Sequence, residues 1–193
     1  EEVAKGSMPT VCLRQIKDTE GYYDLFIFNL EGDLIYSVYK EVDFATNFVS
    51  GPYRESGLAQ AFEMARDGDA KTAYFADFRP YAPSADSPAA FLATPVIDSI
   101  GATIGVVAIQ VASDQIATIV NNPMGLGQSG EVYLLGQDLN TRSPSRFDGG
   151  HQILEQLGDT TQGRSALEKE PLFIADTIGI NGAPVVAKAS RLD

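Results

Sequence analysis

Asp77 and Arg79 carry side chains well suited to hold a small polar molecule. They lie two positions apart in a segment, residues 73–79, that is expected to be a strand, so both should share one face with Phe75 beside them. A carboxylate accepts hydrogen bonds from an amine, and a guanidinium binds a carboxylate through two parallel bonds. The spacing predicts a ligand-binding pair; the alternative is a surface ion pair worth ~0–1 kcal/mol.

Catalytic chemistry has much weaker support. His151 is the only histidine and follows two glycines, so we expect it in a surface loop. A hydrolase that pairs it with Ser143 or Ser145 is conceivable, but the sequence has no G-x-S-x-G motif around a nucleophile. Cys12 is the only cysteine, which excludes an internal disulfide. We therefore expect no enzymatic activity and no catalytic residue.

No metal or cofactor site is expected either. The sequence has no Cys/His spacing that suits zinc, and residues 67–69, Asp-Gly-Asp, lack the ligand pattern of a calcium loop. Residues 125–130 spell GLGQSG, which matches a dinucleotide-binding GxGxxG. Such a loop follows a strand and opens a helix, whereas here a predicted helix precedes the glycines and a predicted strand follows them. These glycines are better interpreted as a joint between two modules.

Composition limits the possible partners. The chain has 193 residues, of which 44% are hydrophobic, so it can bury a core. Its net charge of −12 disfavours nucleic acid and anionic membrane surfaces, because phosphate binding needs clustered Lys and Arg. No apolar run approaches the ~20 residues of a membrane helix. The longest run, residues 102–112, is interrupted by Gly105 and Gln110 and is expected to be a buried strand.

Periodicity predicts an α+β fold in which one plan occurs twice. A helix ends near residue 20, a second is capped by Ser56 and stopped by Gly68, and a long structured loop covers residues 41–55. The first half is completed by strands at 24–30, 34–39, 73–79, 89–97 and 102–112 and a helix at 114–122. The second half is expected to contain a hairpin at 131–135 and 139–142, a helix at 152–157 closed by Gly158, and strands at 172–178 and 184–189.

Several segments resemble the PAS-like modules of double Cache sensor domains. In the order of that family they are GYYDLF (21–26), GDLIYSV (32–38), KEVDF (40–44), GPY (51–53), ATPVID (93–98), GVVA (105–108), GLGQSGEVYL (125–134) and RS (142–143). The resemblance covers residues 21–190. It implies two antiparallel-sheet modules in series: a lead-in helix over 1–20, a membrane-distal ligand-binding module over 21–123, and a smaller, incomplete membrane-proximal module over 124–193.

In this family a small ligand binds between the distal sheet and the loop and helix that cover it. The resemblance implies that the ligand-binding residues are Asp43, Asn47, Tyr53, Arg54, Phe75, Asp77, Arg79, Tyr81 and Phe91. The amino-acid-sensing subset has Trp-Tyr two and three positions after an arginine, whereas Arg54 is followed by Glu-Ser-Gly. The ligand is therefore left open among organic acids, amines and amino-acid-like compounds.

The resemblance implies a periplasmic, ligand-sensing segment of a receptor anchored in the bacterial inner membrane. Methyl-accepting chemotaxis proteins are the main expectation, and a histidine kinase or nucleotide cyclase is the alternative. The chain begins at Glu1 without a methionine and looks like an excised piece of a longer receptor. The family further implies homodimerisation in the full receptor. A protein-interaction module without a small-molecule ligand remains the alternative outside the sensor class.

Overall fold

The computed structural model describes residues 8–157, 160–167 and 172–191. The chain folds into two compact units, Glu1–Gln115 and Ile116–Asp193. The glycines at residues 125–130, predicted from the sequence as the joint between the modules, lie about ten residues beyond this boundary. The module boundaries implied by the family resemblance stay a prediction. The two units are described separately below.

The first unit is built on a five-stranded sheet with the strand order β2-β1-β5-β4-β3. Every neighbouring pair in this sheet is antiparallel. The strands are β1 (Asp24–Phe28), β2 (Leu34–Ser37), β3 (Tyr74–Tyr81), β4 (Ser87–Ile97) and β5 (Thr103–Gln110). This sheet confirms the predicted α+β class and all five predicted strands of the first half, with ends that differ by at most two residues.

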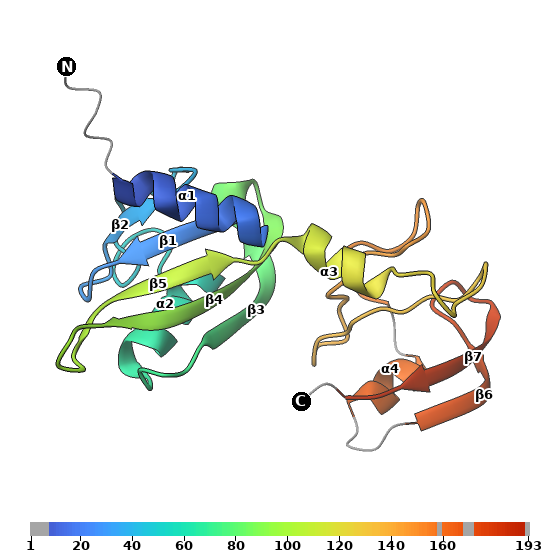
Figure 1. The fold of residues 1–193 in the computed structure, drawn as a ribbon. Helices are drawn as coiled ribbons and strands as arrows, with labels where there is room; N and C mark the ends of the chain where they lie inside the picture. The colour runs from blue at the N-terminus through green and yellow to red at the C-terminus, as the bar shows by residue number, and fades with distance from the viewer. Residues whose placement is uncertain (1–7, 158–159, 168–171, 192–193) are drawn as a thin grey trace. The chain divides into compact units, whose positions relative to one another are not determined.

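Two helices pack on this sheet, α1 (Met8–Glu20) and α2 (Gly57–Asp67). Figure 1 shows α1 on the near side of the sheet and α2 behind it. The helix α2 begins where predicted, because the Ser56 hydroxyl accepts a hydrogen bond from the backbone N–H of Ala59. It ends where Gly68 donates its backbone N–H to the carbonyl of Ala65.

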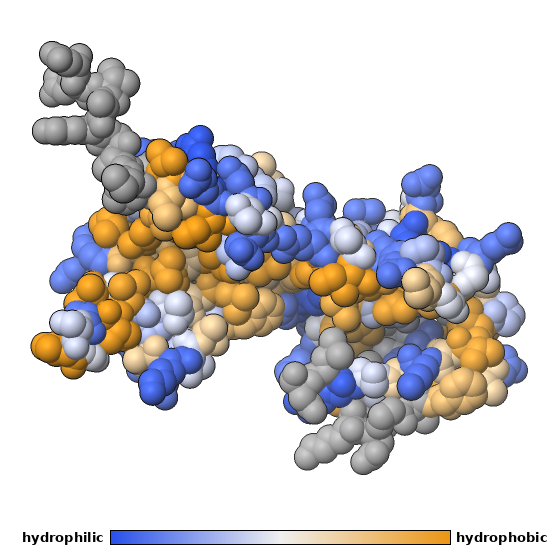
Figure 2. Space-filling model, viewed as in Figure 1, coloured by the Kyte–Doolittle hydropathy of each residue, from blue (hydrophilic) through white to orange (hydrophobic). Residues whose placement is uncertain are grey.

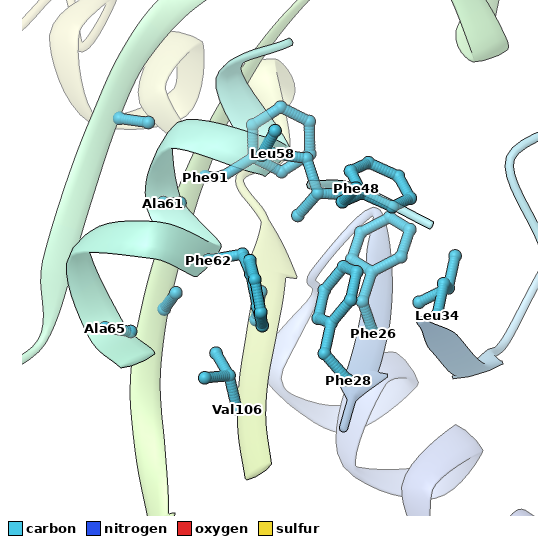
Figure 3. Packing of buried hydrophobic residues seen from close by; sticks show 14 of the residues in the cluster. Phe26, Phe28, Leu34, Phe48, Leu58, Ala61, Phe62, Ala65, Phe91 and Val106 are labelled. Carbon is cyan, nitrogen blue, oxygen red and sulfur yellow. The ribbon is translucent and has the colours of Figure 1, made fainter. Parts of the chain in front are cut away.

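The main core lies between α2 and the sheet. The ring of Phe28 lies 5.1 Å from that of Phe48 and 5.0 Å from that of Phe62, so strand, loop and helix meet there (Figure 3). Ala61 and Ala65 are fully buried and let the helix approach the strands closely. Burying a Phe side chain contributes about 1.5–3 kcal/mol, so this aromatic cluster is a major source of stability.

The segment between β2 and α2 is a long loop that is ordered by hydrogen bonds, as predicted. Leu34 donates its backbone N–H to the carbonyl of Thr46, and Phe48 donates to the carbonyl of Gly32. The buried Phe48 side chain inserts into the core and fixes the loop over the sheet. A connection of this length inside a compact domain is typical of functional loops.

The second unit contains an antiparallel pair, β6 (Leu172–Ile178) and β7 (Pro184–Ala189), beside the helix α4 (Thr161–Ala166). The predicted Asn-Gly turn joins the strands, and Gly182 has the positive φ of +77° that favours glycine there. The chain reaches this unit through α3 (Ser113–Val120), which the sequence predicted at 114–122.

Of the predictions for the second unit, the helix at 152–157 is wrong and the hairpin at 131–135 and 139–142 is only partly formed. Residues 152–157 do not form a helix, because their backbone pairs with another segment: Leu154 has a positive φ of +68° and donates to the carbonyl of Thr141. The hairpin predicted at 131–142 is reduced to a turn with one isolated bridge between Leu135 and Thr141. Gly158, predicted to close that helix, lies outside the described residues.

Apolar side chains are not confined to the core. Figure 2 shows orange, apolar atoms on the visible face of the first unit, on the same side as α1. Large hydrophobic residues at least half exposed in this unit are Val11, Ile35, Tyr39, Val42, Phe75, Ile100 and Ile104. Among the described residues, no helix has both the length and the hydropathy that a bilayer crossing requires.

Candidate ligand-binding site

The predicted residues on β3 do not all face the same way. Phe75, Asp77 and Arg79 are exposed, as expected for residues that alternate with the buried Ala76. The pairing of β3 with β4 shifts register between Ala76 and Arg79, which inserts one extra residue. This bulge reverses the alternation, so that Tyr81 points into the core although its spacing from Phe75 is even.

The predicted loop residues have separate environments. The Asn47 side chain donates to the Glu31 carbonyl and to the Asp33 carboxylate, and it accepts from the backbone N–H groups of Val49 and Ser50. Its polar atoms therefore hold the loop against the β1–β2 turn. Arg54 is exposed and pairs with the adjacent Glu55 at 3.3 Å. The half-buried Tyr53 ring lies 6.0 Å from that of Phe48.

Three predicted residues meet in the interior, namely Asp43, Tyr81 and Phe91. The Tyr81 hydroxyl donates to Asp43 Oδ2, and the Tyr81 ring lies 5.0 Å from the Phe91 ring in an edge-on contact. Asp43 is fully buried, and its second carboxylate oxygen has no hydrogen-bond partner. Burial raises the pKa of Asp43, an effect that the Tyr81 hydrogen bond opposes.

Two further polar residues, Asp24 and Gln110, belong to this cluster and were not singled out as binding residues from the sequence. Gln110 on β5 is in register with Asp24 on β1 and with Phe91 on β4, so the three side chains share the core face of the sheet. Gln110 is 4% exposed, and its Oε1 atom has no hydrogen-bond partner. The only sequence signal was that Gln110 interrupts the longest apolar run.

Asp24 is held by backbone rather than by a cation. Its Oδ1 accepts from the backbone N–H groups of Leu25, Val38 and Tyr39 at 2.7, 3.0 and 3.3 Å. Burial raises the pKa of Asp24 to about 6, because these hydrogen bonds offset only part of the desolvation cost, and the nearby charge of Asp43 adds to the increase. The cluster thus holds two buried carboxyl groups of raised pKa.

A recess of about 230 Å³ lies at this end of the sheet, within the first unit. Its walls come from the segment before β1, the β3–β4 connection with the start of β4, and the chain from the end of β5 into α3. They are formed by Tyr23, Ser84, Ser87, Pro88, Gln110, Val111, Ala112, Ser113 and Asp114. The recess therefore brings together residues that are far apart in sequence, with Gln110 among them.

Glu41 supports one wall of this recess. The Ser84 hydroxyl donates to Glu41 Oε2 at 2.8 Å, and the Tyr23 hydroxyl lies 3.5 Å from Oε1. Burial raises the pKa of Tyr23, and the Glu41 charge raises it further. The long loop therefore contributes to the recess through Glu41, a residue that the sequence did not single out.

The second unit has its own polar cluster around His151, whose position corrects the prediction of a surface histidine. His151 is only 7% exposed, its Nδ1 lies 3.9 Å from Glu131 Oε1, and its Nε2 has no hydrogen-bond partner. The Ser145 hydroxyl donates to Glu131. The serine is therefore bound to a carboxylate rather than to the imidazole base that a hydrolase nucleophile needs. Within the described residues, no group of three or more His, Cys, Asp or Glu side chains is placed to hold a metal.

Comparison with known proteins gives structural relatives only. No family profile matches the sequence, and no curated protein matches it. The extracellular domain of rpHK1S-Z16, assigned to a histidine kinase, aligns over 91% of this chain and 68% of its own, with a TM-score of 0.63 and 16% identity. The periplasmic sensory domain of the Campylobacter jejuni chemoreceptor Tlp1 aligns over 94% and 71%, with a TM-score of 0.58 and 13% identity.

A third relative is the ligand-binding domain of the Pseudomonas fluorescens chemoreceptor CtaA, solved with L-serine. It aligns over 88% of this chain and 66% of its own, with a TM-score of 0.55 and 13% identity. The chain spans only 30% of a longer extracellular ligand-binding receptor from Desulfohalobium retbaense. These similarities agree with the α+β architecture of the first unit. The chain therefore has the fold of Cache-type sensor domains, as its sequence motifs predicted.

Proposed function

We propose that this chain is the extracytoplasmic sensing segment of a membrane-anchored bacterial receptor and binds a small molecule in the recess of its first unit. The observation that carries the proposal is the recess itself, a hollow of about 230 Å³ whose lining includes Tyr23, Ser84 and the polar residue Gln110 from separate parts of the chain. The fold supports the proposal, because it is shared with ligand-binding sensor domains.

The position of the recess also suits signalling. Val111 and Ala112 line it just before α3, and Ser113 and Asp114 line it as the first residues of α3, the helix whose chain continues into the second unit. A ligand that binds better to one arrangement of this segment would shift the population of receptor states. The output remains open between a chemoreceptor and a histidine kinase, since relatives of both kinds share the fold.

A thermal-shift screen of organic acids, amines, amino acids and purines tests the proposal. A specific ligand raises the melting temperature by mass action. Replacing the exposed, recess-lining Ser87 with Trp should abolish the shift by filling the recess. The matched variant Ser99→Trp, at an exposed serine in the β4–β5 turn, should retain it. A screen in which no compound stabilises the protein would contradict the proposed function and favour a protein-interaction module.

A further inference from the structure

Three carboxylates anchor the first part of the long loop, residues 38–45, to the rest of the first unit. We call this segment the acidic strap. At its start, Asp24 Oδ1 on β1 accepts from the backbone N–H groups of Val38 and Tyr39 at 3.0 and 3.3 Å. Asp24 itself is only 1% exposed. The first anchor therefore fixes the strap to the sheet through a buried acidic group.

The other two anchors belong to the strap itself. Glu41 accepts from the hydroxyl of Ser84, in the β3–β4 connection, at 2.8 Å, and Ser84 is part of the recess wall. Asp43 is fully buried and accepts from the hydroxyl of Tyr81 on β3. The strap is thus joined to three different parts of the first unit by acidic side chains, so its position depends on their charge.

Cations do not balance these charges. Among the residues that the structure describes, no Lys or Arg forms an ion pair with the three anchoring carboxylates. Lys17 on α1 pairs with Asp18 at 2.8 Å, and the Lys40 ammonium lies over the Phe44 ring, 5.3 Å from its centroid. The negative charges of the strap therefore act mainly on one another.

The carboxyl groups influence each other's ionisation. Burial raises the pKa values of Asp24 and Asp43, and neighbouring charge adds to the increase: Asp43 acts on Asp24, and Glu41 acts on Asp43. The phenols that face the cluster, Tyr23 and Tyr81, stay neutral near pH 7, because burial raises their pKa values too. Ionising both aspartates thus adds repulsion that their hydrogen bonds offset only in part, whereas a proton on either one relieves it.

The backbone of the strap is strained as well. Lys40 and Ala45 have positive φ angles of +52° and +61°, although neither is glycine. Side chains with a Cβ disfavour this conformation, which persists only where surrounding contacts impose it. Val42, between these two positions, is 70% exposed, so the strap runs along the surface of the unit. Weaker anchors would therefore favour release of this segment.

We propose that the acidic strap is a pH-dependent latch on the recess, held closed by protons on its buried carboxyl groups and released when they are lost. Release alters the recess, because Glu41 supports its wall through Ser84. A carboxyl group that binds its proton more tightly in the closed state stabilises that state as the pH falls through its pKa. The value of about 6 for Asp24 places this change between pH 7 and pH 5. The latch belongs to the first unit alone and does not require a small-molecule ligand.

Hydrogen exchange on the whole chain tests the latch. The backbone N–H groups of Val38 and Phe44 are bonded within the strap and its anchors. After correction for the intrinsic pH dependence of exchange, both should be about tenfold better protected at pH 5 than at pH 7. Linkage gives this ratio for a carboxyl group whose pKa is raised from 3.8 to about 6 in the closed state.

A double variant, Asp24→Asn with Asp43→Asn, isolates the protons as the cause. Each asparagine keeps an acceptor oxygen but does not titrate, so the difference in protection should fall below about twofold. The matched control is Glu63→Gln, at an exposed glutamate on α2, which should keep the tenfold difference. Equal protection at the two pH values in the wild type, or a tenfold difference that persists in the double variant, would overturn the latch.

A measurement on the wild type covers the case in which the double variant does not fold. Carbon-13 NMR follows the side-chain carboxyl carbons of Asp24 and Asp43 across the same pH range. At least one of them should titrate with the midpoint at which the protection of Val38 changes. Titration of both groups with midpoints below about pH 4, as in ordinary aspartates, would overturn the latch.

Discussion

The hydroxyl of Tyr81 donates a hydrogen bond to the carboxylate of Asp43, although the two residues are 38 positions apart in the chain. The bond joins the long loop to β3 inside the core. Both residues were predicted as ligand contacts, which stays a prediction; the structure shows that they hold the loop over the sheet. Their side chains are almost completely buried, with Tyr81 1% and Asp43 0% exposed.

Tyr81→Phe should therefore destabilise the first unit. The substitution leaves Asp43 with no side-chain partner in a buried position, which costs about 1–3 kcal/mol at pH 7. The loss should shrink at pH 5, because the unpaired carboxyl group takes up a proton more readily. Urea unfolding at the two pH values measures this change. The control is Tyr53→Phe, at a half-buried tyrosine of the same loop; an equal loss in both variants would contradict the role of the bond.

The raised pKa of Asp24 predicts that stability increases as the pH falls below neutrality. The folded-state value of about 6 exceeds the ordinary 3.8, so the folded protein binds the proton more tightly than the unfolded chain does. By linkage, the free energy of unfolding should rise by about 2–3 kcal/mol as the pH falls from 7 to about 4. Carboxylates with lowered pKa values, such as Asp33 and Asp67, oppose this gain at the acid end of the window.

Asp24→Asn isolates this contribution. The amide oxygen of asparagine can still accept the backbone hydrogen bonds that Asp24 accepts, but the side chain does not titrate. The variant should be at least as stable as the wild type at pH 7 and should gain less between pH 7 and 5. Denaturant titrations at several pH values provide the measurement. An unchanged pH slope would show that the titration of Asp24 does not control stability in this range.

Asn47 makes hydrogen bonds that give it a structural role. Asn47→Ala should remove the contacts that bind the long loop to the β1–β2 turn and cost about 1–3 kcal/mol. Because the Asn47 hydrogen bond is the largest cause of the lowered pKa of Asp33, that pKa should rise in the variant. Chemical denaturation and NMR titration of the Asp33 carboxyl carbon measure the two effects. If neither quantity changes, the role assigned to Asn47 is wrong.

Phe28 and Phe75 should respond very differently to truncation. Phe28 is 0% exposed and contacts two other rings, so Phe28→Ala should cost about 3–5 kcal/mol. Phe75 is 52% exposed, and Phe75→Ala should change stability by less than about 1 kcal/mol. Thermal and urea unfolding compare the pair directly. Similar losses would mean that Phe75 is covered in solution.

Local patterns predicted the first unit well because its elements have strong signals. Ser56 and Gly68 mark the ends of α2. A strand with one buried face has alternating apolar residues, and a strand with both faces buried has a continuous apolar run. The second unit was predicted less well. Residues 152–157 have helix-forming side chains, but their backbone groups form hydrogen bonds with the backbone of Thr141. Hydrogen bonds between segments that are distant in sequence leave no pattern in the local sequence.

The candidate site, too, could be predicted only where local sequence patterns determine the structure. Period-two spacing predicted that Phe75, Asp77 and Arg79 share one face, and the structure shows all three exposed. A bulge redirected Tyr81, and no sequence feature marked that bulge. Gln110 could be noticed only as a polar residue in an apolar strand. Its register with Asp24 and Phe91, which makes it part of a cluster, depends on how three strands pair.

The most direct test of the central claim is a crystal structure of the protein with the compound that stabilises it most. The account predicts that this molecule lies in the recess of the first unit, in contact with Tyr23, Ser84 and Ser87. A ligand found on the exposed side of β3 beside Asp77 and Arg79, or in the second unit, would contradict it.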